Sequence, residues 1–153
     1  MTTVEQLCAR LVGDVDHARA CRVVDLADAR VIASYPRRPD VNESAEAHAE
    51  ILAALLAGPE LDALLVMLAG QGNGPSSSRT MDREIALSAD GYVHLARTLS
   101  SRGCALVLTA SAACNLGLGW ALLRETLPRI ELAVTNGGPP PDRQRPTTTM
   151  EHE

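Results

Sequence analysis

Apolar residues recur at helical spacing in three stretches of the chain, and the first of these is residues 3–19. Here the apolar positions lie three and four residues apart, while the charged side chains fall elsewhere on the helical wheel. This spacing predicts an amphipathic helix with one side against a core. The apolar side consists of Val4, Leu7, Cys8, Leu11, Val12 and Val15.

The second helical stretch follows the prolines of residues 36–39 and ends at Ala57, before Gly58. Asn42 or Ser44 is its expected N-cap. Large apolar residues form one side, and alanines make the remaining surface small enough for another helix to approach closely. The large residues are Ile51, Leu52, Leu55 and Leu56, and the alanines are Ala47, Ala53, Ala54 and Ala57.

The third helical stretch runs from about Ala113 to Leu127, where Pro128 is expected to stop it, because proline lacks the backbone N–H that a helix interior needs. Between the second and third helices, residues 60–70 have the composition of one or two further helical turns. The Gly, Pro and Ser residues of 71–80 predict a loop.

Five short runs of the chain predict β-strands. Residues 21–27 and 30–35 are rich in β-branched side chains and form an expected hairpin with its turn at Asp28. Two alternating runs flank the Asp90-Gly91 pair, which is a strong hairpin signal. In residues 103–110 the side chains on both alternating faces are mostly apolar, as in a central strand covered on both sides.

These elements predict an α/β chain of the α+β type in the order α-β-β-α-β-β-β-α. We expect a five-stranded, mostly antiparallel sheet sandwiched between helices, with the first and last helices on one face and the second on the other. The folded domain is expected over residues 1–135. Residues 136–153 are rich in Pro, Gly and Thr, which predicts a disordered C-terminal tail.

The composition argues against several classes of function. The chain has 153 residues and a net charge of −5, and all 14 basic residues are arginine. Without lysine, the chain has neither the lysine of a phosphate-binding P-loop nor an amine for a Schiff base, so both classes are excluded. The acidic balance and the lack of a basic patch with aromatic residues argue against nucleic acid as a partner.

The sequence also predicts where the protein works. The first 20 residues carry acidic side chains and lack the unbroken apolar run of a secretory signal. Since no apolar stretch reaches about 18 residues, we expect a cytoplasmic protein with no membrane insertion. Buried, reduced thiols are expected because no C-x-x-C pair occurs among the four cysteines, Cys8, Cys21, Cys104 and Cys114.

Candidate catalytic motifs are weak. Residues 109–113 read Thr-Ala-Ser-Ala-Ala where a nucleophile elbow needs G-x-S-x-G, and Cys114 has apolar neighbours without a flanking base. The four histidines lack the spacing of zinc ligands. Residues 70–75, Gly-Gln-Gly-Asn-Gly-Pro, do not fit the dinucleotide-binding pattern. We therefore expect a protein that is not an enzyme, with no catalytic residue, no cofactor and no metal.

The stretch from Arg83 to Glu125 resembles the second half of a Roadblock/LC7 domain, a dynein light chain-related family with a profilin-like fold. The resemblance rests on a strand, an Asp/Gly-centred hairpin, an apolar strand and the sequence Asn-Leu-Gly-Leu at residues 115–118. With the first half in the same order, it covers residues 3–132. Ala29 stands where the family usually has glycine, and residues 36–42 and 59–81 are longer than usual.

The resemblance implies a dimer in which the second helices pair and the third strands join the two sheets. The unpaired edge of the third strand and the small alanine surface of the second helix support this expectation. The expected partner in this dimer is a second copy of the chain or a paralogous Roadblock protein. The expected interface residues are Ala53, Ala57, Arg83, Ile85 and Leu87.

Bacterial members of the family accompany small Ras-like GTPases, so the resemblance implies a non-enzymatic regulator, activator or scaffold of such a GTPase. The expected partner-binding residues are Glu43, Glu46, Ala47, Glu50 and Ala54. Two alternatives stay open. One is a structural or cargo adaptor without nucleotide-linked function, and the other is a small-ligand sensor, because a sheet with helices on both faces can enclose a pocket.

Overall fold

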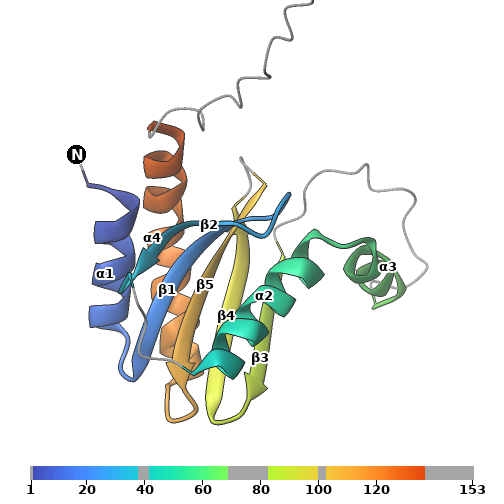
Figure 1. Ribbon diagram of the computed structural model, residues 1–153, viewed down its shortest axis with the longest axis horizontal. Helices are drawn as coiled ribbons and strands as arrows, with labels where there is room; N and C mark the ends of the chain where they lie inside the picture. Colours follow the sequence, from blue (N-terminus) through green and yellow to red (C-terminus); the bar gives the residue numbers. More distant parts are fainter. Residues whose placement is uncertain (1, 38–41, 69–82, 100–102, 137–153) are drawn as a thin grey trace, which may run out of the picture.

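A computed structural model describes residues 2–37, 42–68, 83–99 and 103–136 of the chain (Figure 1). Nine helices and strands occur within these residues. They are α1 (Val4–Asp14), β1 (Ala18–Asp25), β2 (Val31–Tyr35), α2 (Glu43–Ala57), α3 (Pro59–Leu68), β3 (Glu84–Ala89), β4 (Tyr92–Leu99), β5 (Cys104–Ser111) and α4 (Leu116–Asn136). The loop predicted over 71–80 and residues 137–153 of the predicted tail lie outside the described residues.

The five strands form one sheet in the order β2-β1-β5-β4-β3, and every neighbouring pair is antiparallel. As the sequence predicts, β5 lies at the centre, while β2 and β3 form the two edges. Helices α1 and α4 cover one face of the sheet and α2 crosses the other face over β4 and β3 (Figure 1). The predicted fold class and layer arrangement are confirmed.

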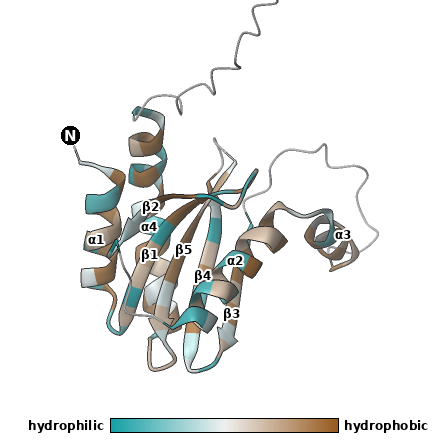
Figure 2. Cartoon of the chain, in the orientation of Figure 1, coloured by the Kyte–Doolittle hydropathy of each residue, from teal (hydrophilic) through white to brown (hydrophobic). Residues whose placement is uncertain are grey.

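Two apolar clusters hold these layers together, one on each face of the sheet. Along β5, Leu106 and Leu108 belong to the cluster under α1 and α4, whereas Ala105 and Val107 belong to the cluster under α2. All four side chains are fully buried. Because a strand alternates its side chains between two faces, the apolar run along β5 serves both clusters (Figure 2).

The two predicted hairpins turn where the sequence places them. Asp90 and Gly91 have φ values of 52° and 81°, so the turn between β3 and β4 uses the left-handed conformation that an Asp-Gly pair readily adopts. Ala29 has a φ of 56° between β1 and β2. This is the position where the Roadblock family usually has glycine, and the conformation explains that preference.

Helix α1 is shorter than predicted. It ends at Asp14 instead of residue 19, and Ala18 and Arg19 already belong to β1. His17 has a φ of 66°, which a continuing helix does not allow. Val15 lies just past the helix but is buried in the same cluster, so the apolar spacing continues beyond the last helical turn.

The expectation that Pro128 ends the last helix is wrong, because α4 continues through it to Asn136. A proline inside a helix removes one hydrogen bond and costs about 3 kcal/mol. Beyond Pro128, Ile130 is fully buried, and Ala133 and Val134 pack against the same cluster. Burying one large aliphatic side chain contributes about 1.5 to 3 kcal/mol, so this packing offsets the lost hydrogen bond.

One or two helical turns are predicted over residues 60–70, and residues 60–68 form all but the first position of the ten-residue helix α3. Residues 69 and 70 lie outside the described residues. Pro59 occupies its first position, where a missing N–H is tolerated. Helix α3 is bent by 63° from α2. Within the described residues no single helix satisfies the length and hydropathy needed to cross a membrane, and only α2 and α3 taken together as a bent pair do.

The start of α4 is held by a side-chain cap. The backbone N–H of Leu118 donates to Oδ1 of Asn115 at 3.1 Å, which makes Asn115 the N-cap. A side chain at Gly119 would place its Cβ 3.0 Å from Cδ1 of Leu95, so this glycine lets the helix approach the sheet. At Gly117 a Cβ would meet only the Asn115 side chain, at 3.4 Å, and we assign that glycine no packing role.

We predict that Asn115→Ala lowers the free energy of unfolding by about 1 kcal/mol, because the first turn of α4 loses its side-chain acceptor. Asn115→Asp keeps an acceptor at the same place and is expected to retain the stability. Urea unfolding of the three proteins checks this. An alanine variant as stable as the parent would show that the cap does not contribute.

Candidate partner-binding surface

Helix α2 packs on the sheet mainly through small side chains. Its buried residues are Ala45, Ala49, Leu52, Ala53 and Leu56. Ala53, predicted to lie in the dimer interface, is only 1% exposed because it faces the sheet of its own chain. We correct that prediction, since a side chain enclosed in its own core has no surface to offer to a second copy.

The large apolar residues of α2 do not share one side, contrary to the prediction. Leu52 and Leu56 are buried, whereas Ile51 and Leu55 face outward. Ile51 is 52% exposed and Leu55 is 42% exposed. Together with the exposed Ala47 and Ala54, they form what we call the apolar stripe. Spacing in the sequence fails here because the buried positions are mostly alanines, which contribute less to a hydrophobic pattern than Ile or Leu.

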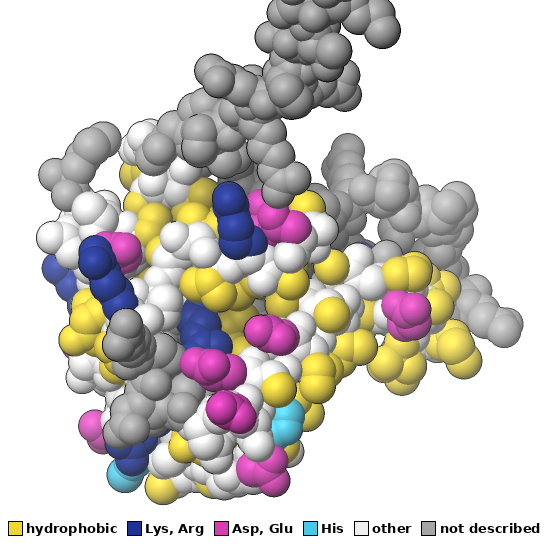
Figure 3. Space-filling view, viewed as in Figure 1, with side chains coloured by type: hydrophobic (Ala, Val, Ile, Leu, Met, Phe, Trp, Pro, Cys, Tyr) yellow, Lys and Arg dark blue, Asp and Glu magenta, His cyan; other side chains and the backbone are white. Residues whose placement is uncertain are grey.

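A second strip of the α2 surface is acidic. Glu43, Glu46 and Glu50 are exposed along the side of the helix nearer β1, and we call them the acidic ridge (Figure 3). Oε1 of Glu46 lies 3.5 Å from Nη2 of Arg22, whose side chain is buried between β1 and α2. The predicted partner-binding residues thus share the outer surface of α2, with Ala47 and Ala54 in the stripe and the glutamates in the ridge.

The remaining predicted interface residues lie near the β3 edge. Ile85 and Leu87 are half-buried and pack against the cluster under α2. Nη1 of Arg83 donates to the carbonyl of Leu56 at 3.1 Å, which joins β3 to the last turn of α2. Ala57 is exposed at that end of the helix. Arg83, Ile85 and Leu87 thus lie along β3, which pairs only with β4 among the described strands, and Ala57 lies next to the Leu56 carbonyl that Arg83 contacts.

The other side of β3 is anchored to α4 by charge. Oε1 of Glu84 accepts hydrogen bonds from Nη1 of Arg97 at 2.9 Å and Nε of Arg124 at 2.8 Å, and Oε2 accepts from Nη2 of Arg124 at 2.6 Å. Arg124 and Arg97 together lower the pKa of Glu84, with the Arg124 hydrogen bond as the largest cause. This network joins the edge strand β3 to its neighbour β4 and to α4.

A histidine pair lies beneath α2, and the sequence did not reveal it. His94 on β4 is fully buried, and its Nδ1 lies 2.9 Å from Oγ1 of Thr109. Its ring meets that of His48 on α2 edge to face at 5.8 Å. Within the described part of the chain, Nε2 of His94 and Nδ1 of His48 are buried without a hydrogen-bond partner.

Burial lowers the pKa of His94 to about 4, with smaller contributions from the nearby His48 and Arg22. The imidazole is therefore neutral at physiological pH. The signal for His94 and Arg22 in the sequence was their place between apolar neighbours in strands. Such a position indicates burial only when both faces of the sheet are known to be covered.

The cysteine thiols considered for catalysis do not lie in surroundings that would activate them. All four cysteines are buried and reduced, as predicted. Burial raises the pKa of Cys114, and the hydrogen bond with Cys8 raises that of Cys21, so neither thiol is activated. Among the residues that the structure describes, no three metal-ligating side chains gather at one place.

The fold is defined by its strand order, its antiparallel pairing, and the placement of α1 and α4 on one face of the sheet and α2 on the other. Solved structures of other proteins share this fold. The crystal structure of MglC from Myxococcus xanthus matches 82% of this chain and 94% of its own, at 20% identity and a TM-score of 0.52. A Roadblock/LC7 domain from Streptomyces avermitilis matches 88% and 97%, at 18% identity and a TM-score of 0.53.

The gliding protein MglB from Thermus thermophilus matches 87% of this chain and 89% of its own, at 14% identity and a TM-score of 0.61. Comparison of the sequence with protein-family models and with curated proteins gives no match. The chain has the Roadblock/LC7 fold. The resemblance indicated by the strand, hairpin and Asn-Leu-Gly-Leu pattern is thereby confirmed at the level of the fold.

We predict that acidification destabilises the protein through His94. In the unfolded chain its imidazole titrates near 6.5, and in the folded chain near 4. Between these values the unfolded state binds a proton that the folded state does not. The free energy of unfolding is therefore largest above pH 6.5 and falls as the pH drops toward 4, by up to about 1.4 kcal/mol per pH unit.

Urea unfolding across this pH range measures the slope. His94→Asn removes the titrating group, so its slope is expected to be shallower than that of the parent. His17→Asn is the matched control, because His17 is exposed and asparagine tolerates its positive φ. Equal slopes for the parent and His94→Asn would contradict the prediction.

Proposed function

We propose that this protein is a non-enzymatic dimeric regulator or scaffold of a small Ras-like GTPase. The observation that carries the proposal is the division of the α2 surface into two strips. The apolar stripe lies on the side of α2 toward β3, and the acidic ridge lies on the side toward β1 (Figure 3). One helix thus offers different surfaces to two different partners.

The apolar stripe suits a second copy of the chain. Ile51 and Leu55 lie on the side of α2 toward β3, which pairs only with β4 among the described strands. A two-fold axis through that edge would bring two stripes together while the two sheets join. Such a dimer would cover the apolar stripe and the β3 edge at the same time. Exposed apolar side chains and strand edges both favour association. Among the neighbours in fold is a structure described as MglB with a tetrameric arrangement, which supports assembly of similar domains.

The acidic ridge suits a different protein. A row of carboxylates on both copies of a dimer would oppose close pairing along that side, because like charges repel. It would instead attract a basic surface. Fold neighbours that include MglB and MglC, together with the GTPase association implied by the family resemblance, support a Ras-like GTPase as that partner.

The dimer is tested by placing a charge in the apolar stripe. We expect Leu55→Asp to weaken the dimer by about 100-fold or more, because the symmetric interface contains the substitution twice and each copy loses about 1.5 to 3 kcal/mol of apolar burial. Leu118→Asp is the matched control, since Leu118 is 43% exposed on α4, compared with 42% for Leu55. Sedimentation equilibrium measures both; a monomeric parent protein at micromolar concentration would refute the dimer.

The GTPase partner is tested by titrating the purified protein with each Ras-like GTPase of the source organism, loaded with GDP or with a non-hydrolysable GTP analogue. We expect preference for one nucleotide state. The double variant Glu43→Arg and Glu50→Arg is expected to weaken binding by about tenfold or more while the dimer persists. Glu46 is left unchanged because it pairs with Arg22.

The matched control for this experiment is the double variant Asp14→Arg and Glu125→Arg. It changes the net charge equally at exposed positions on α1 and α4. If both double variants bind alike, the acidic ridge is not the contact. A dimer that binds no GTPase in either state would instead favour a structural adaptor without nucleotide-linked function.

A further inference from the structure

A hollow lies at the opposite end of the sheet from β3, where α1, β2 and α4 meet. It has a volume of about 660 Å³. Its apolar lining comes from three elements and consists of Val4 and Leu7 on α1, Ile32 and Ala33 on β2, and Leu132 and Ala133 on α4. We call it the β2 hollow.

The strand that borders the β2 hollow is an exposed edge. Among the described strands, β2 pairs only with β1. The pairing register of these two strands shifts between Val23 and Val24 of β1. Ile32 lines the hollow, whereas Val31 lines a smaller groove on the α2 side of the sheet. Val31, Ile32 and Tyr35 are all exposed, so β2 presents apolar side chains in addition to its outward backbone groups.

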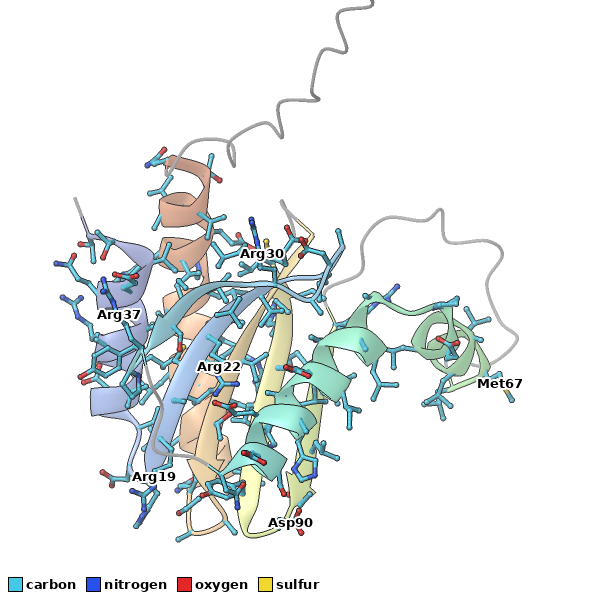
Figure 4. The ribbon with its side chains drawn as sticks, in the orientation of Figure 1. Arg19, Arg22, Arg30, Arg37, Met67 and Asp90 are labelled. Atoms are coloured by element: carbon cyan, nitrogen blue, oxygen red, sulfur yellow. The ribbon has the colours of Figure 1, made fainter. Side chains whose placement is uncertain are left out.

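Arginines lie around the hollow and at both ends of this edge, although the protein as a whole is acidic and Glu46 and Glu50 line the groove on the α2 side. Arg10 and Arg129 line the hollow, and neither has an ion pair within the described part of the chain. Arg30 and Arg37 flank β2 at its two ends (Figure 4). Only one acidic side chain, Glu5, lines the hollow among the described residues.

We propose that the β2 hollow and the adjoining β2 edge form a second docking surface, which binds a short, extended, acidic and apolar segment of a partner protein. Apolar side chains of the segment enter the hollow between α1 and α4. Its carboxylates pair with Arg10 and Arg129, and its backbone lies along β2. This is the β-strand addition mode of peptide recognition, in which main-chain hydrogen bonds supply affinity and pockets supply specificity.

The shape and charge of the surface favour a peptide segment over a lipid bilayer. A bilayer is flat and contacts convex surfaces, whereas the apolar residues here line a depression. The carboxylate of Glu5 in that depression and the net charge of −5 both oppose an anionic membrane. The proposal does not depend on the proposed dimer or GTPase, because β2 and β3 are opposite edges of the sheet.

The test is a selection from a random peptide library of about eight residues, a length typical of strands. The library is first depleted on the full-length double variant Arg10→Glu and Arg129→Glu and then selected on the parent protein. We expect the recovered peptides to be enriched in Asp and Glu together with Val, Ile or Leu. No enrichment, or enrichment in basic peptides, would overturn the proposal.

The strongest recovered peptide is then titrated against single variants by fluorescence polarisation. We expect Arg129→Glu to weaken binding by about tenfold or more, since a charged hydrogen bond is replaced by repulsion between like charges. Arg19→Glu is the matched control, because this exposed arginine lies at the far end of β1 (Figure 4). Equal weakening by both variants would show a non-specific charge effect and overturn the proposal.

Leu132→Ser tests the apolar contribution separately. Leu132 is exposed, so the substitution is expected to leave the thermal unfolding temperature unchanged while it weakens binding of the peptide. A second copy of this chain is the other possible occupant of the surface. Sedimentation of the parent protein and of the double variant Arg10→Glu and Arg129→Glu tests for it. If these two charge reversals abolish self-association, the surface takes a second copy of this chain and the proposed peptide partner is wrong.

Discussion

The whole arrangement depends on the burial of β5 on both faces. A strand with no polar face in the middle of the sheet requires cover on each side, and no single layer of helices can provide it. Helices α1 and α4 cover the larger cluster and α2 covers the smaller one. Because β1 and β4 occupy both sides of β5, β2 and β3 are the edges of the sheet within the described part of the chain.

The smaller cluster explains the surface of α2. Ala45, Ala49 and Ala53 bring the helix close to the sheet, where Ala96 and Ala105 lie beneath it. Only two leucines of α2 fit into that narrow layer, so the helix has large apolar residues left over. These residues stand outside, where they cost solvation unless another surface covers them. Close packing inside the chain thus generates the apolar stripe outside it.

Much of the fold was predictable because its strongest signals are local. The Asp-Gly turn, the doubly apolar β5 and the cap at Asn115 each follow from one or two residues whose conformational preference is pronounced. The end of α4 was not predictable in this way. The cost of Pro128 is local, but the burial of Ile130 that outweighs it depends on α1, which lies more than a hundred residues earlier in the chain.

The site was less predictable than the fold because it depends on packing between segments that are distant in the sequence. Glutamates on a helix are expected outside, and Glu43 and Glu50 are exposed. Which alanines face inward depends on the rotation of α2 on the sheet, and this rotation is fixed by contacts with β3 and β4. The two edges also differ in ways that spacing does not reveal. The Glu84 network joins β3 to α4, whereas β2 is irregular in register and bordered by a hollow. A regular, anchored edge favours continuation of the sheet into an identical strand, and an irregular edge beside a pocket favours a single extended segment.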